Sequence, residues 1–300
     1  MCGRLSQYRG IHDFVAALSI PNALLNYAGD QPFERYNAAP TTQLALFYRD
    51  GEYLRADMVR WGWRPHWAKD RAAPINARVE KVAHGPFFKA IWPHRAIIAI
   101  DNWFEWVYES GPKKQPYLIR HRDRTPILCA AIGQYPIGEH EPNEHDGFVI
   151  ITADSAGGMV DIHDRRPVTL SPELAREWMD PATPKERAEQ MVLHEGELSE
   201  AFEWFKVDRA IGNVQHLDAR LCCPDKSKAY DEDDVDFETS FFATSQGETT
   251  EAKQLFTWKV EYTQDFSTGK LFINAVQCVT PGAIMIKDLN FSAVAVDEKE

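Results

Sequence analysis

The residue with the most distinctive chemistry in this sequence is Cys2, which directly follows Met1. Initiator methionine is commonly removed before a small residue, and removal leaves an amine and a thiol on adjacent carbons. The amine can condense with an aldehyde, and the thiol can then close a five-membered thiazolidine ring on the same carbon. An α-amine has a pKa of about 7.7–8.0, so much of it is neutral and nucleophilic at physiological pH. Cys2 therefore predicts a nucleophile for aldehydes, although by itself it could equally be an incidental second residue.

Three further residues could assist such a nucleophile by acid–base chemistry or hydrogen bonding. Glu105 lies among aromatic residues in Trp-Phe-Glu-Trp, and His163 precedes a pair of arginines in Asp-Ile-His-Asp-Arg-Arg-Pro. Asn76 lies in Ile-Asn-Ala-Arg-Val-Glu. Taken singly, the tryptophans could be plain core, the glutamate an exposed strand carboxylate and the histidine structural. Together, a nucleophile, a carboxylate in an apolar setting, a histidine and an amide indicate a reaction centre.

The distribution of charge is compatible with nucleic-acid binding, although the net charge is −12. Residues 1–224 contain 26 Lys and Arg against 30 Asp and Glu, whereas residues 225–300 contain 7 against 15. Most of the acidic excess therefore lies in the last quarter of the chain. Only 7 of the 26 basic residues in the first part are lysine. Arginine suits phosphate because its planar group donates two parallel hydrogen bonds.

No metal, cofactor or membrane is expected. The five cysteines match no zinc or disulfide framework, and apart from Cys2 we interpret them as reduced thiols: Cys129, Cys222, Cys223 and Cys278. The sequence has no HExxH motif and no glycine-rich nucleotide loop. It also has no secretory signal and no apolar run of about 18 residues. We expect a soluble bacterial protein of the cytoplasm that associates with the nucleoid when bound to DNA.

Short apolar segments and a few helix signals predict an α+β fold. A helix is expected over 11–18, and two more should begin at Ser171-Pro172 and at Thr183, where Glu186 completes a capping box. Buried strands are expected over 59–63, 97–100, 117–119, 127–132 and 148–152.

The chain changes character after Pro224. Residues 1–224 are expected to form one domain, 225–238 an acidic linker, and 239–300 a small strand-rich appendage. Alternation of polar and apolar residues over 256–262 predicts a half-buried strand, and 271–279 and 291–296 also resemble strands. A largely disordered tail is the alternative.

A series of short motifs resembles the SOS response-associated peptidase (SRAP) family, which includes an abasic-site sensor. In chain order they are MCGR, YNAAP, WGW, INARVE, WFEW, DIHDRRP and AIGNV, and the resemblance runs from Met1 to about Leu221. It implies a compact single domain with a central, partly closed, mainly antiparallel sheet and peripheral helices.

The resemblance also implies catalytic roles. Cys2, exposed by loss of Met1, would form a thiazolidine with the ring-opened sugar of an abasic site in single-stranded DNA and shield the lesion. Glu105 would be the general acid/base, in ring opening and in an autocatalytic removal of Met1. His163 would shuttle protons, and Asn76 would orient the amine. The implied activities are those of an autoprocessing thiol peptidase and a crosslinking, lyase-like enzyme.

DNA contacts follow from the same resemblance. Phosphate contacts are expected from four arginines, stacking from two tryptophans, and pocket-shaping from three smaller residues: Arg4, Arg78, Arg165, Arg166, Trp67, Trp106, Asn37, Pro40 and Thr152. Residues 68–75 differ in content from the second Trp and Pro pair usual in the family, so one stacking contact is in question. The acidic appendage is expected to regulate access to DNA or to bind a protein partner.

Two other functions fit the same residues. One is a thiol peptidase acting on other proteins through Cys2, His163 and Glu105, although no peptide-binding feature is evident in the sequence. The other is a non-covalent single-stranded DNA binding module in which Cys2 is incidental.

Overall fold

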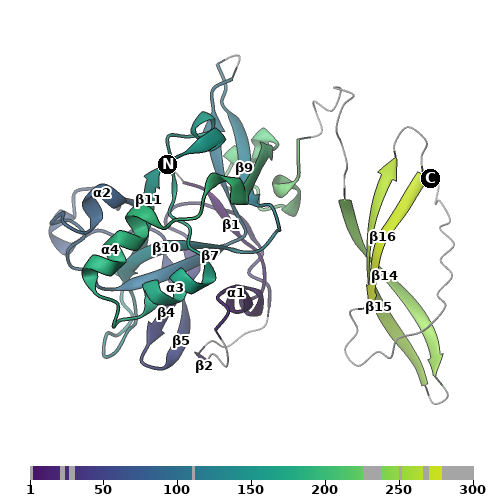
Figure 1. Cartoon of the computed structure of the whole chain (residues 1–300), viewed down its shortest axis with the longest axis horizontal. Coiled ribbons are helices and arrows are strands. Elements are labelled where there is room, and N and C mark those ends of the chain that lie inside the picture. The colour runs from purple at the N-terminus through teal and green to yellow at the C-terminus, as the bar shows by residue number, and fades with distance from the viewer. Residues whose placement is uncertain are drawn as a thin grey trace. The chain divides into compact units, whose positions relative to one another are not determined.

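The computed structural model describes residues 3–20, 24–26, 31–109 and 112–225, together with the backbone of three later strands (Figure 1). The chain divides into two compact units, Met1–Ser227 and Lys228–Glu300. Each unit is considered by itself.

One sheet of the first unit has five strands in the order β13-β9-β8-β1-β3. These strands are β1 (Leu5–Gln7), β3 (Arg35–Ala38), β8 (Asn102–Val107), β9 (Gln115–His121) and β13 (Phe202–Lys206). All neighbours in it are antiparallel, so the first described strand of the chain lies directly beside β8.

The other sheet has eight strands, in the order β12-β11-β10-β7-β4-β5-β2, with β6 paired to β11. They are β2 (Leu24–Asn26), β4 (Gln43–Asp50), β5 (Tyr53–Arg60), β6 (Asn76–Arg78), β7 (Arg95–Ile100), β10 (Ile127–Gln134), β11 (Gly147–Asp154) and β12 (Arg165–Pro167). Only the β2–β5 and β6–β11 pairs of the described strands are parallel. The expected α+β class and mainly antiparallel pairing are confirmed, although the strands form two sheets.

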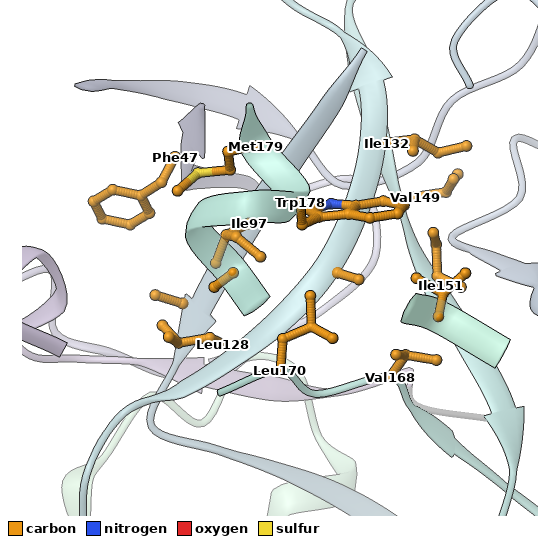
Figure 2. Packing of buried hydrophobic residues seen from close by; sticks show 14 of the residues in the cluster. Phe47, Ile97, Leu128, Ile132, Val149, Ile151, Val168, Leu170, Trp178 and Met179 are labelled. Atoms are coloured by element: carbon orange, nitrogen blue, oxygen red, sulfur yellow. The ribbon is translucent and has the colours of Figure 1, made fainter. Parts of the chain in front are cut away.

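Four α-helices supply the layer that covers one face of the eight-stranded sheet. They are α1 (Ile11–Ala17), α2 (Val79–Val82), α3 (Pro172–Met179) and α4 (Lys185–His194). Their apolar residues join those of the sheet in one core cluster. Figure 2 shows the indole of Trp178 from α3 lying among aliphatic side chains such as Ile97 and Val149. Its Nε1–H donates to the carbonyl oxygens of Ala96, at 2.9 Å, and Ala131, at 3.2 Å.

The opposite face of the eight-stranded sheet packs against the five-stranded sheet. Apolar residues from both sheets, among them Leu5, Trp103 and Ile150, form a second core cluster. Strand β7 contributes Ile97 to the helix-covered core and Ile98 to the core between the sheets. Burial on both faces explains why the strand sequences do not alternate between polar and apolar residues. We call the side of each sheet that meets the other sheet its inner face.

Short 3-10 helices complete the unit: η1 (His66–Ala68), η2 (Gly157–Asp161), η3 (Ser199–Ala201), η4 (Arg209–Gly212) and η5 (Ala219–Cys222). Ile211 of η4 and Leu221 of η5 pack on Phe104 and Leu118, which belong to the outer face of the five-stranded sheet. This sheet is therefore also covered on both sides, at least over its middle strands.

Helix starts follow the sequence at two of the three expected positions. Helix α1 begins at Ile11, and α3 begins at Pro172 with the Ser171 hydroxyl accepting from the Leu174 amide. The expected capping box at Thr183 is wrong. The Thr183 hydroxyl donates instead to the Glu177 carbonyl at 2.6 Å, and α4 begins at Lys185 without a side-chain cap. Thr183 therefore bonds to the end of α3 and does not cap the start of α4.

The second unit contains an antiparallel meander of β14 (Glu238–Thr249), β15 (Ala252–Asp265) and β16 (Lys270–Cys278). Strands β15 and β16 confirm the expected strands at 256–262 and 271–279. Residues 226–237 of the linker expected at 225–238, and the expected strand at 291–296, lie outside the described residues. No helix in the described part of the chain is long and apolar enough to cross a membrane.

Trp178 gives a test of the helix-covered core. Replacing it by Phe removes an N–H that serves two buried carbonyls and leaves unfilled volume. We expect Trp178→Phe to lower the free energy of unfolding by about 2 kcal/mol in urea titrations. Trp67→Phe is the matched control, because Trp67 is 58% exposed, and should change it by less than about 0.5 kcal/mol. Equal effects of the two substitutions would contradict this account of the core.

Candidate functional site

Glu105 is a buried carboxylate at the inner face of the five-stranded sheet. It lies in β8, two residues after Trp103, whose indole belongs to the core between the sheets. Side chains alternate along a strand, so Glu105 projects to the same face as Trp103 while Phe104 and Trp106 project to the outer face. The Glu105 residue is only 4% exposed. The carboxyl group is therefore held where water reaches it poorly.

The beginning of the chain runs alongside this carboxylate. Strand β1 pairs with β8 in the register Leu5 to Trp103 and Ser6 to Asn102. The amide of Phe104 donates to the Arg4 carbonyl at 3.0 Å. Extended by one more residue, this register sets Gly3 opposite Glu105. Cys2, the expected nucleophile, lies outside the described residues.

Burial gives Glu105 an unusual proton affinity. Desolvation raises the pKa of Glu105 to about 7, and the positive charge of the chain's amino terminus acts in the opposite direction. A carboxyl group with a pKa near 7 can both donate and accept a proton at neutral pH. That property suits a general acid/base.

The imidazole of His163 reaches this carboxyl group from the eight-stranded sheet. Its Nε2 atom lies 3.9 Å from Glu105 Oε2. His163 follows η2, and its backbone amide donates to the Met159 carbonyl at 3.1 Å. Desolvation lowers the pKa of His163, and the charge of the amino terminus acts in the same direction. The Arg165 amide donates to Nδ1 at 2.9 Å, which places the proton of the neutral ring on Nε2.

Asn76, Arg78 and Thr152 are brought together on adjacent strands. Strand β6 pairs in parallel with β11, with Asn76 beside Ile150 and Arg78 beside Thr152. Ile150 faces the five-stranded sheet, so these three residues project to the same inner face. Arg78 is exposed, Asn76 is half-buried and Thr152 is fully buried. Sequence motifs separated by some 70 residues thus supply one edge of the site.

Arg165 is a buried structural link. Its guanidinium donates to both carboxylate oxygens of Glu80, at 2.5 and 3.1 Å, and to Asp154 at 2.6 Å. It also donates to the Thr152 carbonyl at 2.6 Å. Pairing with Arg165 lowers the pKa of Glu80. With these four bonds and 5% exposure, Arg165 fixes β12 and the adjoining loop, and the expected phosphate contact is not evident in this arrangement.

Arg166 is separated from the other expected DNA contacts. It pairs with Ala153, which packs against the helix-covered core, so its side chain projects away from the inner face. Its guanidinium donates to the Glu197 carbonyl. Adjacent residues of a strand face opposite sides of a sheet, so Arg165 and Arg166 do not lie on one face.

Arg4, Asn37 and Trp106 form a group on the outer face of the five-stranded sheet. The Arg4 guanidinium donates to Asn37 Oδ1 at 2.6 Å and to the Ile211 carbonyl at 2.8 Å. It also lies over the Trp106 ring, 5.7 Å from the centroid. The Asn37 amide donates to the carbonyls of Ile211, Asn213 and His216. These contacts anchor the segment from Arg209 to His216 onto the sheet.

Two of the residues expected to contact DNA, Trp67 and Pro40, lie outside the strands. Trp67 of η1 is 58% exposed and meets Phe87 edge to face, with centroids 5.6 Å apart. Its large exposed ring is suited to stacking on a base. Pro40 is half-buried and lies two residues after the end of β3, the strand that carries Asn37.

The structure adds three residues that the sequence reasoning missed. Glu80 pairs with Arg165, Asp164 Oδ1 lies 2.7 Å from His163 Nδ1, and the charge of Lys114 lowers the pKa of both Glu105 and His163. Glu80 and Asp164 occur within the motifs that carry Arg78 and His163, so their place in these motifs could have indicated that they belong to the site. Lys114 precedes β9 in a loop with no such pattern.

Other possible sites are less suited to this chemistry. A cavity of about 570 Å³ is lined by residues of the α1 end and the β9–β10 turn, including His121 and Glu197, and by none of the expected site residues. Among the described residues, no group of three or more His, Cys, Asp or Glu side chains could hold a metal ion.

Comparisons with known proteins agree on one family. The family model described as SOS response associated peptidase (SRAP) matches residues 1–214. The abasic site processing protein YedK of Escherichia coli is 42% identical over 225 residues, covering 75% of this chain and all of YedK. The abasic site processing protein YoaM of Bacillus subtilis is 32% identical, covering 60% of this chain and 80% of YoaM. A solved phage-related protein of Bordetella bronchiseptica superposes with a TM-score of 0.59 at 38% identity, covering 69% of this chain and 95% of that protein.

The raised pKa of Glu105 predicts a pH-dependent loss of stability. The folded protein retains a proton that the unfolded chain releases between its ordinary pKa of 4.5 and about 7. Stability from this group is therefore full below pH 4.5 and is lost as pH rises through 7. Glu105→Gln, which cannot ionise, should be more stable than the wild type by about 2 kcal/mol at pH 8, and much less so at pH 5. Urea midpoints at both pH values measure this, and exposed Glu141→Gln should follow the wild type. If the wild type and Glu105→Gln changed equally in stability between pH 5 and pH 8, the raised pKa would be refuted.

Proposed function

Because the chain belongs to the SOS response-associated peptidase family, we propose that it captures abasic sites of single-stranded DNA covalently through Cys2. Relatives from Escherichia coli and Bacillus subtilis bear the name abasic site processing protein. The observation that carries the proposal is the pairing of Glu105 with His163, 3.9 Å apart, beside the strand that begins the chain. The pKa of Glu105 is raised to about 7 and that of His163 is lowered, so near neutral pH a protonated carboxyl group can lie beside a neutral imidazole.

The first step is opening of the abasic sugar. The sugar is a cyclic hemiacetal, and its C1′–O4′ bond must break to expose the C1′ aldehyde. The C1′ hydroxyl loses its proton, and O4′ gains one. Glu105 and His163 are suited to these two transfers, because a proton gained by one can be balanced by a proton lost from the other.

The second step joins the aldehyde to Cys2. The neutral α-amine attacks C1′, and the carbonyl oxygen leaves as water to give a Schiff base. The thiol sulfur then bonds to the same carbon, and its proton passes to the ring nitrogen. The products are one thiazolidine and one water, with no oxidant or cofactor required. Asn76, which projects to the inner face beside Ile150 of β11, would orient the amine.

Removal of Met1 must precede capture, since it generates the amine. This removal is hydrolysis of the Met1–Cys2 peptide bond. A buried carboxyl group that can accept a proton at neutral pH fits the general base that activates water for this step. We therefore assign Glu105 to both processing and capture.

The expected DNA contacts divide according to exposure. Arg78 and Trp67 are exposed and suit a phosphate and a base, respectively. Arg165 supports the site from within, and Arg4 with Asn37 secures the segment after η4. A covalent adduct held among these groups would shield the lesion from strand cleavage.

Denaturing gel electrophoresis of the Met1-processed protein with an abasic oligonucleotide tests the proposal. A heat-stable, slower band is expected with the wild type and not with Cys2→Ala. The Ala variant retains the α-amine, so it should form only a Schiff base, which becomes heat-stable after borohydride reduction. Cys223→Ala is the matched control, because Cys223 is a free, exposed cysteine.

Two DNA controls sharpen this experiment. Intact DNA has no aldehyde, and a tetrahydrofuran analogue of the abasic site cannot open its ring, so neither should give a band. Absence of a band with true abasic DNA, once mass spectrometry shows that Met1 is gone, would disprove covalent capture. Cleavage of unrelated peptides under those conditions would then favour a peptidase acting on other proteins.

Arg78 gives a separate test of the DNA-binding surface. Arg78→Ala should weaken non-covalent binding to intact single strands and reduce the slope of log K against log salt by about 0.7, the contribution of one phosphate contact. Fluorescence anisotropy over a series of salt concentrations measures both. Lys185→Ala, an exposed cation on α4 at the helix-covered side, should leave the slope unchanged. An unchanged slope for Arg78→Ala would remove Arg78 from the DNA path.

A further inference from the structure

Two groups in the described structure compete for one nitrogen of His163. The backbone amide of Arg165 donates to Nδ1 at 2.9 Å, and the Asp164 carboxylate lies 2.7 Å from the same atom. In the plane of an imidazole, Nδ1 carries either a lone pair or a hydrogen. It can accept from the amide or donate to the carboxylate, but it cannot do both at once.

We propose that Asp164 is a positioning residue that converts His163 from an Nε2 donor into an Nε2 acceptor, by accepting a hydrogen bond from Nδ1 when the ring proton has moved there from Nε2. With the Arg165 amide on Nδ1, the neutral ring carries its proton on Nε2. With Asp164 on Nδ1, the ring presents an Nε2 lone pair, and protonation there gives an imidazolium paired with a carboxylate. The catalytic consequence rests on the proposed function, whereas the exchange of partners does not.

The amide that holds the first state is rigidly placed. Arg165 belongs to β12, and its side chain is fixed by Glu80, Asp154 and the Thr152 carbonyl. The Asp164 carbonyl accepts from the Ser155 amide at 2.9 Å, which fixes the backbone on the other side of the amide. The fixed backbone of this loop therefore favours the tautomer of His163 that carries its proton on Nε2.

The carboxylate that holds the second state is exposed by comparison. The Asp164 side chain is 82% exposed, so it can approach or leave Nδ1 without unpacking the core. Its backbone is anchored while its side chain remains in solvent. Exchange between the two partners needs a shift of the ring proton and a small rotation of the imidazole that turns Nδ1 from the Arg165 amide toward the Asp164 carboxylate.

Charges on each side of His163 explain why such a partner is required. Glu105 of β8 faces Nε2, Lys114 approaches from the loop before β9, and Asp164 lies on the histidine's own loop. Burial, the amino terminus and Lys114 all lower the pKa of His163, whereas Asp164 and the hydrogen bond from the Arg165 backbone raise it. Asp164 is thus the nearby carboxylate that favours the protonated form of His163.

The exchange gives each proton in sugar opening a defined path. The C1′ hydroxyl proton passes to the Nε2 lone pair, leaving an imidazolium whose Nδ1–H is held by Asp164. The C1′–O4′ bond breaks, and O4′ takes the proton of the Glu105 carboxyl group. His163 has then gained one proton and Glu105 has lost one, so the pair is balanced.

Nitrogen NMR of the Met1-processed protein tests this directly. Histidine labelled at both ring nitrogens reports the tautomer and the pKa of His163, with its signals assigned by their absence from His163→Asn. Asp164→Asn should lower the pKa of His163 by about one unit and reduce the Nδ1–H population. Asp161→Asn is the control, because Asp161 is an exposed aspartate two residues away, and should change neither. An unchanged tautomer and pKa in Asp164→Asn would overturn the proposal.

The rate of adduct formation supplies the second readout. At neutral pH, Asp164→Asn should slow capture of an abasic oligonucleotide about tenfold, the factor that corresponds to one pKa unit. Asp164→Glu should restore part of the rate, and binding of intact DNA should be unchanged. If the wild type forms no adduct, the proposed function fails while NMR still decides the role of Asp164. If the wild type forms the adduct and Asp164→Asn matches it in NMR and rate, only the role of Asp164 fails.

Discussion

Burial of the Glu105 carboxyl group between two packed sheets is the constraint on which the site depends. Its pKa is raised because the inner faces exclude water, and they do so because apolar side chains of both sheets fill the space between them. A surface glutamate beside His163 would remain ionised at neutral pH and could not act as an acid. The cores that cover the outer sides of both sheets allow this layer to stay closed around a group that destabilises it.

Strand alternation then decides what each charged residue can do. Arg165 and Arg166 are adjacent, yet one is fixed by Glu80 near the site and the other bonds to Glu197 at the helix-covered side. Arg4 likewise lies one residue from Leu5, whose side chain packs between the sheets, and projects to the outer face. Few arginine side chains therefore remain to supply the positive charge expected near DNA, and Arg78 is an exposed one. The remaining arginines hold segments in place.

Local features of the sequence were sufficient to predict the positions of several helices and strands. Helix α3 begins where Ser171 and Pro172 predict it, and the strands around Ile97, Ile127 and Phe148 lie where apolar runs predict buried strands. Contacts distant in sequence could not be predicted from local patterns. Arg4 bonds to a carbonyl 207 residues away, and Thr183 serves the preceding helix because the chain turns back on it. Proximity of Glu105 and His163 was expected only through a family resemblance, since nothing in residue spacing places β8 beside the loop after η2.

The opposite shifts of Glu105 and His163 have a joint consequence. Near neutral pH, an acid whose pKa is raised to about 7 and a base whose pKa is lowered compete for the same protons. Since the Nε2 and Oε2 atoms are 3.9 Å apart, a proton released by one group lies within reach of the other. Within such a pair, the partner of Nδ1 determines whether Nε2 offers a hydrogen or a lone pair. The exposed Asp164 and the fixed Arg165 amide therefore control the direction of proton transfer without altering the packing that created the pair.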